Sequence, residues 1–271
     1  MEKVTNLLPE SLEKLWQYIL KEAKAILDRE PYLNVFITEN ILNHGSLVSS
    51  LGHIISVKLA SKHVPANVLV ELIAFGYSQK PQLGHAAFED ILATVERDPA
   101  CGRFINPLLY FKGFQALQCH RIANFFFQGG SLDLAYYMQM MTSSKFSVDI
   151  HPAAEIGHGI FMDHAHGIVI GETAVVGNNV SLLHAVTLGG TGKEEGDRHP
   201  KIGDGVLIGA GAKVLGNIII GESSRIASGS VVLNNVPKRK TVAGVPAKIV
   251  STVPNETDPS RSMDHKFVSK N

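Results

Sequence analysis

The sequence has almost no cysteine and no surplus of either charge. Its 271 residues include two cysteines, Cys101 and Cys119, which are too few for a disulfide framework and lack the spacing of a metal-binding pair. Lysine plus arginine and aspartate plus glutamate both number 25, so the basic surplus of a nucleic-acid-binding protein is missing. We therefore expect reduced thiols in a cytoplasmic protein that binds no nucleic acid.

The sequence also lacks any long apolar stretch. No hydrophobic run approaches the roughly 20 residues that a membrane-spanning helix needs. The first residues, MEKVTNLLPESLEK, lack the basic start and the apolar core of a secretory signal peptide. Hydrophobic residues make up 45% of the chain and charged residues 18%, which is ordinary for a globular protein. We therefore expect a soluble protein with no membrane partner.

What the sequence does contain is an aliphatic residue at every sixth position of its second half. One series runs through Ile150, Ile156, Met162, Ile168, Ala174, Val180 and Val186, and a second runs through Ile202, Ile208, Val214, Ile220, Ile226 and Val232. A period of six fits neither an amphipathic helix nor an alternating strand. It is typical of a parallel β-solenoid, in which stacked coils bury a continuous apolar column. The segment GGTGKEEGDRHPK breaks the phase between the two series, which predicts one inserted loop.

The residues before this periodicity have helical spacing. Apolar positions predict helices at residues 12–27, 33–43, 51–61, 68–77, 86–97, 107–128 and 132–141. The fold class is therefore α+β, with an all-helical domain over residues 1–146 followed by a β-solenoid over residues 147–250 that carries a loop at 190–201. Residues 251–271 are polar and rich in Asn, Asp, Pro and Ser, so we expect a flexible tail.

Side chains that can do chemistry gather in two segments, VDIHPAAEIGHGIFMDHAHG and GGTGKEEGDRHPK. A histidine held by a carboxylate is suited to remove a proton from a hydroxyl near neutral pH. Asp149 and His164 are fifteen residues apart, and three hexads make an eighteen-residue coil, so we expect the two to lie on adjacent coils within reach of each other. Arg198 offers a planar fork that matches a carboxylate, and the glycine-rich loop lets a ligand approach the backbone.

Three alternatives remain open from the residues alone. The protein could be an acetyl-CoA-dependent O-acetyltransferase that acts on a sugar or another small hydroxyl compound. Such an enzyme would use the solenoid and a catalytic histidine, but it would need no carboxylates to bind an ammonium group. A zinc-dependent solenoid of the carbonic anhydrase kind would use three histidines as ligands. A solenoid that only assembles or regulates would need no cluster of His, Asp and Arg beside the loop.

Several motifs together resemble the serine O-acetyltransferases, a family within the hexapeptide-repeat acyltransferase superfamily. They are RDPA at 97–100, PLLYFKGFQALQCHRIAN at 107–124, DIHPAAEIGHGIFMDHAHGIVIGETAVVG at 149–177, VTLGGTGK and GDRHPKIGDGVLIGAGAKVLGN within 186–217, and AGVPAKIV at 243–250. The resemblance implies a left-handed β-helix and assembly as a homotrimer or a dimer of trimers, with active sites between neighbouring prisms. It implies transfer of an acetyl group from acetyl-CoA to the hydroxyl of L-serine, which gives O-acetylserine for cysteine biosynthesis.

The same resemblance assigns roles by position. His164 would be the general base and Asp149 its orienting partner, with acetyl-CoA as co-substrate and no metal. Asp98 and Asp163 would bind the ammonium group of serine. Arg198 and His199 would bind its carboxylate. The implied coenzyme A contacts are Gly190, Thr191, Gly192, Ala210, Ser228 and Lys248.

Two further partners follow from the resemblance. L-Cysteine inhibits many members at the serine site, and the residues of the serine clamp are present, so we expect inhibition by L-cysteine. Many bacterial members end in an isoleucine that enters the active site of O-acetylserine sulfhydrylase. This chain ends in VSKN, which argues against that complex.

Overall fold

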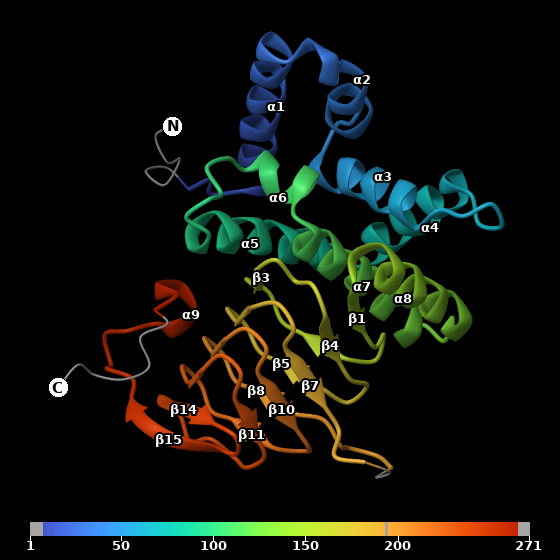
Figure 1. Cartoon of the computed structure of the whole chain (residues 1–271). Helices are drawn as coiled ribbons and strands as arrows, with labels where there is room; N and C mark the ends of the chain where they lie inside the picture. Colours follow the sequence, from blue (N-terminus) through green and yellow to red (C-terminus); the bar gives the residue numbers. More distant parts are fainter. Residues whose placement is uncertain (1–7, 193–194, 265–271) are drawn as a thin grey trace.

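The first half of the chain is helical (Figure 1). The computed structural model describes residues 8–192 and 195–264. Its helical elements here are α1 (Leu12–Arg29), η2 (Pro31–Leu33), α2 (Asn34–Ile37), η3 (Thr38–Leu42), α3 (Leu47–Leu59), α4 (Ala66–Gln79), α5 (Gln82–Arg97), α6 (Ile105–Tyr110), α7 (Lys112–Gln128) and α8 (Leu132–Phe146). Each helix predicted from apolar spacing overlaps one or more of these, so the helical interpretation of this half is confirmed.

Local chemistry sets the ends of these helices. The Oγ atom of Ser11 accepts a hydrogen bond from the backbone N–H of Lys14 at 3.2 Å and so caps α1. The single helix expected behind Pro107 is instead two helices, because Phe111 has extended backbone angles of φ −97° and ψ 105° between α6 and α7. Among the described residues, no helix combines the length and the apolar character needed to cross a membrane.

The second half is a parallel β-helix. Its strands are β1 (Val148–Ile150), β2 (Glu155–Ile156), β3 (Phe161–Met162), β4 (Ile168–Ile170), β5 (Val175–Val176), β6 (Ser181–Leu182), β7 (Thr187–Gly189), β8 (Lys201–Ile202), β9 (Leu207–Ile208), β10 (Lys213–Leu215), β11 (Ile219–Ile220), β12 (Arg225–Ile226), β13 (Val231–Val232), β14 (Lys240–Gly244) and β15 (Ala247–Thr252).

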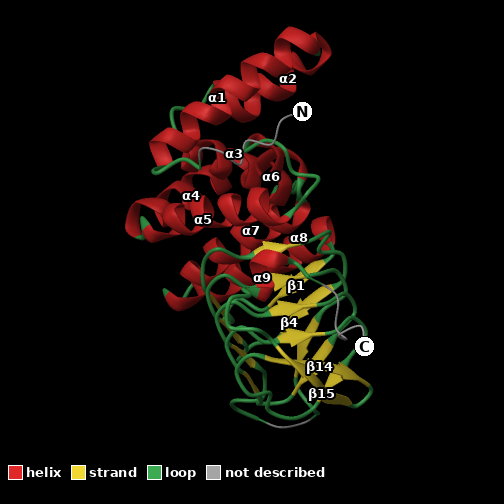
Figure 2. Ribbon diagram, turned by 90° about the vertical axis from the view of Figure 1, so that its left-hand side faces the viewer, coloured by secondary structure: helices red, strands yellow, loops and turns green. Residues whose placement is uncertain are grey.

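Three sheets form the walls of this prism (Figures 1 and 2). The first sheet has the order β1-β4-β7-β10-β13, the second β2-β5-β8-β11, and the third β3-β6-β9-β12-β14-β15. The paired strands are parallel except for the β14–β15 hairpin. We call the corner between the third and first sheets the first edge, and the corner between the first and second sheets the second edge.

The coils differ in length, and the sequence pattern missed one reason for it. Val148 pairs with Ile168, a coil of 20 residues, and Thr187 pairs with Lys213, a coil of 26. Lys213 pairs with Val231, which is the regular coil of 18. The β-helix therefore contains two insertions relative to 18, of two residues in the turn after β3 and of eight in the loop after β7.

The six-residue pattern did not reveal the shorter insertion, because strand β4 has two inward-facing apolar residues that are two positions apart. Ile168 and Ile170 are 0% and 1% exposed, and both belong to the buried core. The six-residue series steps from Met162 in one inward-facing column to Ile168 in the other. Both positions are apolar, so the series continues across the insertion without a visible break. The predicted single break was therefore wrong, although the solenoid itself is confirmed.

The segment after β15 is packed against the protein, contrary to the expectation of a flexible tail from residue 251. Val253 is 1% exposed, and a short helix, α9 (Pro259–Ser262), contacts α5. Ser181 of β6 donates its hydroxyl to the carbonyl of Ser260 at 2.8 Å, and Arg239 donates to the carbonyl of Pro254. The polar composition misled because backbone carbonyls hold this segment in addition to its few buried apolar side chains, such as Val253.

Helices α5 and α7 attach the helical half to the β-helix. Asp90 of α5 and Arg121 of α7 form a buried ion pair, with 2.8 Å between Arg121 Nη2 and Asp90 Oδ2. Arg121 also donates to the carbonyls of Ile156 and Gly157 at 3.2 and 2.7 Å, and Asp90 accepts from the N–H of Ile160 at 2.9 Å. Because the two charged groups bind each other and also backbone groups of the first coil, this buried pair fixes α5 and α7 against that coil.

Candidate active site

A cavity of about 340 Å³ lies where the helical half meets the β-helix. It is lined by residues from the end of α5, the α6–α7 junction and the turn after β3: Asp98, Ala100, Tyr110, Phe111, Lys112, Gly113, Phe161, Met162, Asp163 and His164. Three of the predicted site residues, Asp98, Asp163 and His164, are therefore brought together. Asp98 is far from the other two in the sequence, but α5 packs against the β-helix and brings Asp98 close to them.

The turn that carries His164 is strained. His164 and Ala165 have φ values of 55° and 58°, in the left-handed region that non-glycine residues seldom adopt. The Ala165 N–H donates to the Asp163 carbonyl at 2.5 Å, and the His166 N–H donates to the His164 carbonyl at 2.8 Å. This is the turn that contains the two-residue insertion. Backbone strain of this kind clusters at functional sites, which makes the turn a candidate for one.

The carboxyl group of Asp163 sits in an unfavourable place for a negative charge. Burial raises its pKa above the ordinary value, and the nearby Asp98 raises it further, while His164 and His184 act in the opposite direction. His164 Nε2 lies 3.8 Å from Asp163 Oδ1. Asp98 is oriented by the N–H of Ala100, which donates to its Oδ1 atom at 2.7 Å. A partly buried carboxyl group with a second carboxyl group nearby forms a place where a cation is stabilised.

His164 projects from the first edge of the prism. Its side chain is 76% exposed, and its ring meets that of His184 edge to face, with 5.9 Å between centroids. In the same turn, Nδ1 of His166 lies 3.3 Å from Nζ of Lys112. An exposed imidazole beside a cavity is free to meet a substrate, and His184 and Lys112 are contributions that the sequence reasoning did not single out.

Arg198 and His199 lie on the second edge, at the end of the 190–201 loop. Arg198 Nη2 donates to Glu172 Oε2 at 2.5 Å, and the Arg198 N–H donates to Thr173 Oγ1 at 3.0 Å. His199 is 7% exposed, and its Nδ1 atom accepts the Thr173 N–H at 3.2 Å. Burial lowers the pKa of His199, and Arg198 lowers it further. The neutral form of the imidazole is therefore favoured beside the guanidinium of Arg198.

Asp149 lies on the face of the first sheet rather than in the turn that carries His164. It lies in β1 opposite Val169 of β4, and its Oδ1 atom accepts from Gln139 Nε2 at 2.7 Å. Within residues 8–192 and 195–264, no hydrogen bond or ion pair joins Asp149 to His164. The expectation of adjacent coils assumed eighteen residues per coil. The coil is 20 residues long here, so the position opposite Asp149 falls five residues beyond His164, on the face of the first sheet.

The predicted coenzyme A contacts are divided between the two edges. On the first edge, the Gly229 N–H donates to the Ala210 carbonyl at 2.8 Å, and Ser228 is exposed beside it. On the second edge lie Gly190, Thr191 and Gly192, where Gly192 has a φ of 148° and a side chain added to it would meet nothing within 4 Å. Lys248 lies apart from both, in the β14–β15 hairpin opposite Ala243. Lys193 and Glu194 of the predicted loop lie outside the described residues.

Sequence reasoning missed several side chains that complete these two groups. Tyr110 and Phe111 line the cavity, and Glu172, Thr173 and Gln139 bind predicted site residues directly. The triplet Gly171-Glu172-Thr173 stands within a motif that was recognised as a whole, but nothing in its spacing distinguished it from any other corner of the solenoid. These residues act through contacts with a loop that is distant along the coil, which spacing cannot reveal.

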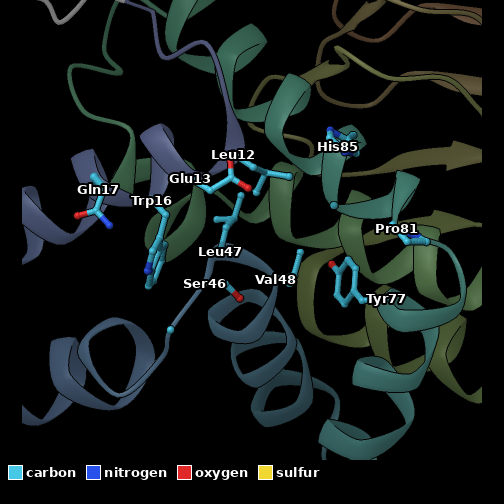
Figure 3. Close-up of a pocket in the computed structure, with 12 residues that line it drawn as sticks. Leu12, Glu13, Trp16, Gln17, Ser46, Leu47, Val48, Tyr77, Pro81 and His85 are labelled. Atoms are coloured by element: carbon cyan, nitrogen blue, oxygen red, sulfur yellow. The ribbon is translucent and has the colours of Figure 1, made fainter.

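Among residues 8–192 and 195–264, no group of three or more His, Cys, Asp and Glu side chains is arranged to hold a metal ion. A second cavity of about 330 Å³ lies among α1, α3 and α5 (Figure 3). Trp16, Leu47 and Tyr77 contribute to its lining, and none of the predicted site residues does. Its lining includes one carboxylate, Glu13, and one histidine, His85, among mainly apolar side chains.

A parallel β-helix that carries a histidine and two carboxylates beside a helical domain defines a hexapeptide-repeat acyltransferase. Residues 199–234 match the family described as bacterial transferase hexapeptide (six repeats), and residues 15–119 match the family described as serine acetyltransferase, N-terminal. The chain is 50% identical over 258 residues to a serine acetyltransferase of Salmonella typhimurium, covering 95% of this chain and 94% of the relative. The corresponding enzyme of Haemophilus influenzae is 49% identical over 254 residues, covering 94% and 95%.

Solved structures agree with this similarity. A serine acetyltransferase in complex with cysteine superimposes with a TM-score of 0.93 at 48% identity, over 95% of this chain and 100% of that one. A serine acetyltransferase from Brucella abortus in complex with coenzyme A gives a TM-score of 0.87 at 50% identity, over 89% and 96%. The chain belongs to the serine acetyltransferase family, and it is therefore an acyltransferase.

Proposed function

We propose that this chain transfers the acetyl group of acetyl-CoA to the hydroxyl of L-serine, giving O-acetylserine and coenzyme A for L-cysteine biosynthesis. The observation that carries the proposal is the junction of Asp98, Asp163 and His164 at one cavity of about 340 Å³. A hydroxyl nucleophile needs a base, and an amino-acid substrate needs a counter-charge for its ammonium group. Both requirements are met by neighbouring side chains of one chain.

The ammonium group of serine binds between Asp98 and Asp163. The Asp163 carboxyl group has a pKa raised by burial and by Asp98, so its charged form lacks compensation when no cation is present. A bound ammonium group restores that compensation, and the pair then prefers a zwitterionic substrate to a neutral alcohol. This preference separates serine from a sugar, the substrate of the alternative O-acetyltransferase.

His164 acts as the general base. Its imidazole takes the proton of the serine hydroxyl as the oxygen forms a bond to the carbonyl carbon of the acetyl thioester. The tetrahedral intermediate then expels the sulfur of coenzyme A, and the imidazolium returns the proton to that sulfur. No acyl-enzyme is formed because the substrate itself is the nucleophile.

The carboxylate of serine binds Arg198 and His199 of a neighbouring copy. In one chain these residues lie on the second edge, separated from His164 by a three-residue strand of the first sheet, a span of roughly 10 Å. A trimer with parallel prism axes places the first edge of one copy against the second edge of the next. Asp149, in the strand of the first sheet that leads to the second edge, then approaches His164 from the neighbouring copy and orients its ring. We propose a homotrimer as the active unit, alone or within a dimer of trimers.

Acetyl-CoA lies in the groove between the same two edges. Gly192, which follows Gly190 and Thr191, has open space beside it on one side, and Ala210 and Ser228 lie on the first edge on the other. The relative from Brucella abortus was solved with coenzyme A, which supports a site for this co-substrate. A role for Lys248 requires that the coenzyme reach the β14–β15 hairpin.

We also propose that L-cysteine inhibits the enzyme by occupying the serine site. A relative was solved in complex with cysteine, and cysteine presents the same ammonium and carboxylate groups as serine. The thiol replaces the hydroxyl, so the clamp binds both. The final residues VSKN, to which the expectation about O-acetylserine sulfhydrylase refers, lie outside the described residues.

The experiment that tests the reaction measures release of coenzyme A thiol from acetyl-CoA with L-serine, L-homoserine, ethanolamine or a simple sugar as acceptor. We expect L-serine to be strongly preferred, and mass spectrometry to identify O-acetylserine. Ethanolamine lacks the carboxylate, and its poor use would report on Arg198 and His199. Equal rates with a sugar would refute the proposal and favour the alternative O-acetyltransferase, which has no use for the two carboxylates.

A further inference from the structure

Thr173, in the turn between β4 and β5, binds the end of the 190–201 loop through every polar group it has. Its Oγ1 atom accepts the backbone N–H of Arg198 at 3.0 Å and that of His199 at 3.1 Å. Its carbonyl accepts from Nζ of Lys201 at 2.6 Å, and that ammonium also binds Asp197 Oδ1 at 2.5 Å. One side chain therefore fixes the backbone of two consecutive residues.

The remaining contacts of Thr173 reach the imidazole of His199. The Thr173 N–H lies 3.2 Å from His199 Nδ1, and Thr173 Oγ1 lies 2.9 Å from the same atom. A backbone N–H can only donate, so Nδ1 must present its lone pair. The Thr173 hydroxyl also hydrogen-bonds the carboxylate of Asp197, so it is the backbone N–H of Thr173 that fixes Nδ1 as an acceptor. The proton of the neutral ring is consequently on Nε2.

The ring of His199 is held from below as well. A Cβ atom added to Gly171 would lie 2.0 Å from His199 Nε2, so the imidazole rests directly on the backbone of the preceding coil. The charged groups around it are Arg198 and Lys201 on the loop, with Glu172 and His151 on the turns beside it. Burial, Arg198, Lys201 and His151 lower the pKa of His199, and only Glu172 raises it. A neutral ring is therefore consistent with its surroundings.

We propose that Thr173 is a positioning residue for substrate recognition, which holds Arg198 in place and locks His199 as the neutral tautomer whose Nε2–H donates to the carboxylate of the substrate. The inference rests on the proposed function. The fixed tautomer explains how His199 can bind the substrate carboxylate beside Arg198 without carrying a positive charge. A protonated His199 next to Arg198 would suffer from repulsion, whereas a fixed Nε2–H donor does not.

The test compares Thr173→Val, which removes the hydroxyl at nearly constant shape, with Thr173→Ser, which retains it. Valine leaves the backbone N–H groups of Arg198 and His199 without their acceptor, so we expect the KM for L-serine to rise by about tenfold or more. Serine at this position should restore the KM to within about threefold of the original value. The KM for acetyl-CoA should change little in both variants, which also shows that they fold.

A second readout is independent of activity. With ¹⁵N-labelled histidine, NMR should show the unprotonated shift for Nδ1 of His199 and the protonated shift for Nε2, and the Thr173→Val variant should show a mixture of tautomers. A protonated Nδ1 in the unaltered protein would overturn the inference, even if the valine variant did not fold. So would a valine variant with an unchanged KM for serine and unchanged nitrogen shifts. If the unaltered enzyme did not acetylate serine, the proposed function would fail, while the nitrogen shifts would still decide the role of Thr173.

Discussion

Gly113 of α7 and Met162 of β3 are in contact through their backbones at the mouth of the candidate active site. A Cβ atom on Gly113 would lie 2.3 Å from the carbonyl oxygen of Met162 and 3.0 Å from the Cβ atom of Ala165. Met162 directly precedes Asp163 and His164 in the chain. The helical half therefore touches the turn that carries the proposed base, and it does so at a place where only a glycine fits.

We predict that Gly113→Ala lowers kcat/KM for L-serine. The added methyl group forces the Asp163–His164 turn away from α7, and displacements of about 1 Å can cost about 100-fold in rate. Steady-state assays of thiol release measure the effect. Gly45→Ala is the matched control, because a side chain there would meet nothing within 4 Å. Similar losses in both variants would mean that the close contact does not set the geometry of the turn.

Mixing two inactive variants tests whether the site is shared between copies. His164→Ala and Arg198→Ala should each lose most of their activity with serine. If one copy supplies His164 and its neighbour supplies Arg198, random mixed trimers should contain intact sites at about one quarter of their interfaces. We therefore expect activity to reappear after co-expression or subunit exchange. Activity that stays at the level of the single variants would place both residues in the site of one chain.

Asp163→Asn should separate substrate binding from stability. It removes the counter-charge of the ammonium group, so we expect the KM for serine to rise by at least about tenfold, since the loss of one partner of a close charge pair is costly. Thiol-release assays at varied serine concentration measure this. The KM for acetyl-CoA should be affected much less, because that co-substrate carries no ammonium group.

The same variant has a predicted pH signature. Burial raises the pKa of Asp163 in the folded protein, with a contribution from Asp98, so the folded state binds the proton more tightly than the unfolded chain does. The free energy of unfolding therefore falls as pH rises through the window above the ordinary carboxyl pKa, and this cost is complete above the raised pKa. Asp163→Asn removes the cost. Without substrate, its melting temperature relative to the unaltered protein should increase between about pH 3 and pH 7. A difference that is independent of pH would contradict this.

The buried pair Asp90–Arg121 should dominate the attachment of the helical half. The two side chains are 0% and 7% exposed, and replacing Asp90 with Asn leaves a buried guanidinium without its counter-charge. We expect Asp90→Asn to lower the free energy of unfolding by about 3–5 kcal/mol, as measured by urea denaturation. The exposed pair Glu222–Lys238 is the control, and Glu222→Gln should cost less than about 1 kcal/mol. Comparable effects of the two changes would show that burial does not govern the cost.

The fold could be predicted from the sequence because its two halves have different periods. Aliphatic residues at every sixth position specify stacked coils, and apolar spacing of 3–4 residues specifies helices. The two-residue insertion after Met162 escaped because Ile168 and Ile170 are both buried, so either phase satisfies the pattern. The docking of residues 253–264 escaped for a different reason, since carbonyl contacts such as Pro254 to Arg239 leave no mark in composition.

The candidate site was predictable only as a set of residue types. Asp98, Asp163 and His164 do meet at one cavity, but the meeting depends on how α5 docks, which no local pattern encodes. The direct pairing of Asp149 with His164 was inferred from a regular coil length that the insertion changes. Thr173 could not be recognised at all, because its importance lies in hydrogen bonds to residues 25 and 26 positions away.

The central claim is that His164 removes the proton of the serine hydroxyl while acetyl-CoA is bound. The most direct test is the turnover of acetyl-CoA with saturating L-serine in the unaltered enzyme and in His164→Ala, with His166→Ala as the neighbouring control. We predict that His164→Ala lowers kcat by about 10²–10⁴-fold, the range for loss of a general base, while acetyl-CoA still binds. His166→Ala should retain most of its activity. Turnover in His164→Ala that equals that of the unaltered enzyme would remove His164 from the mechanism.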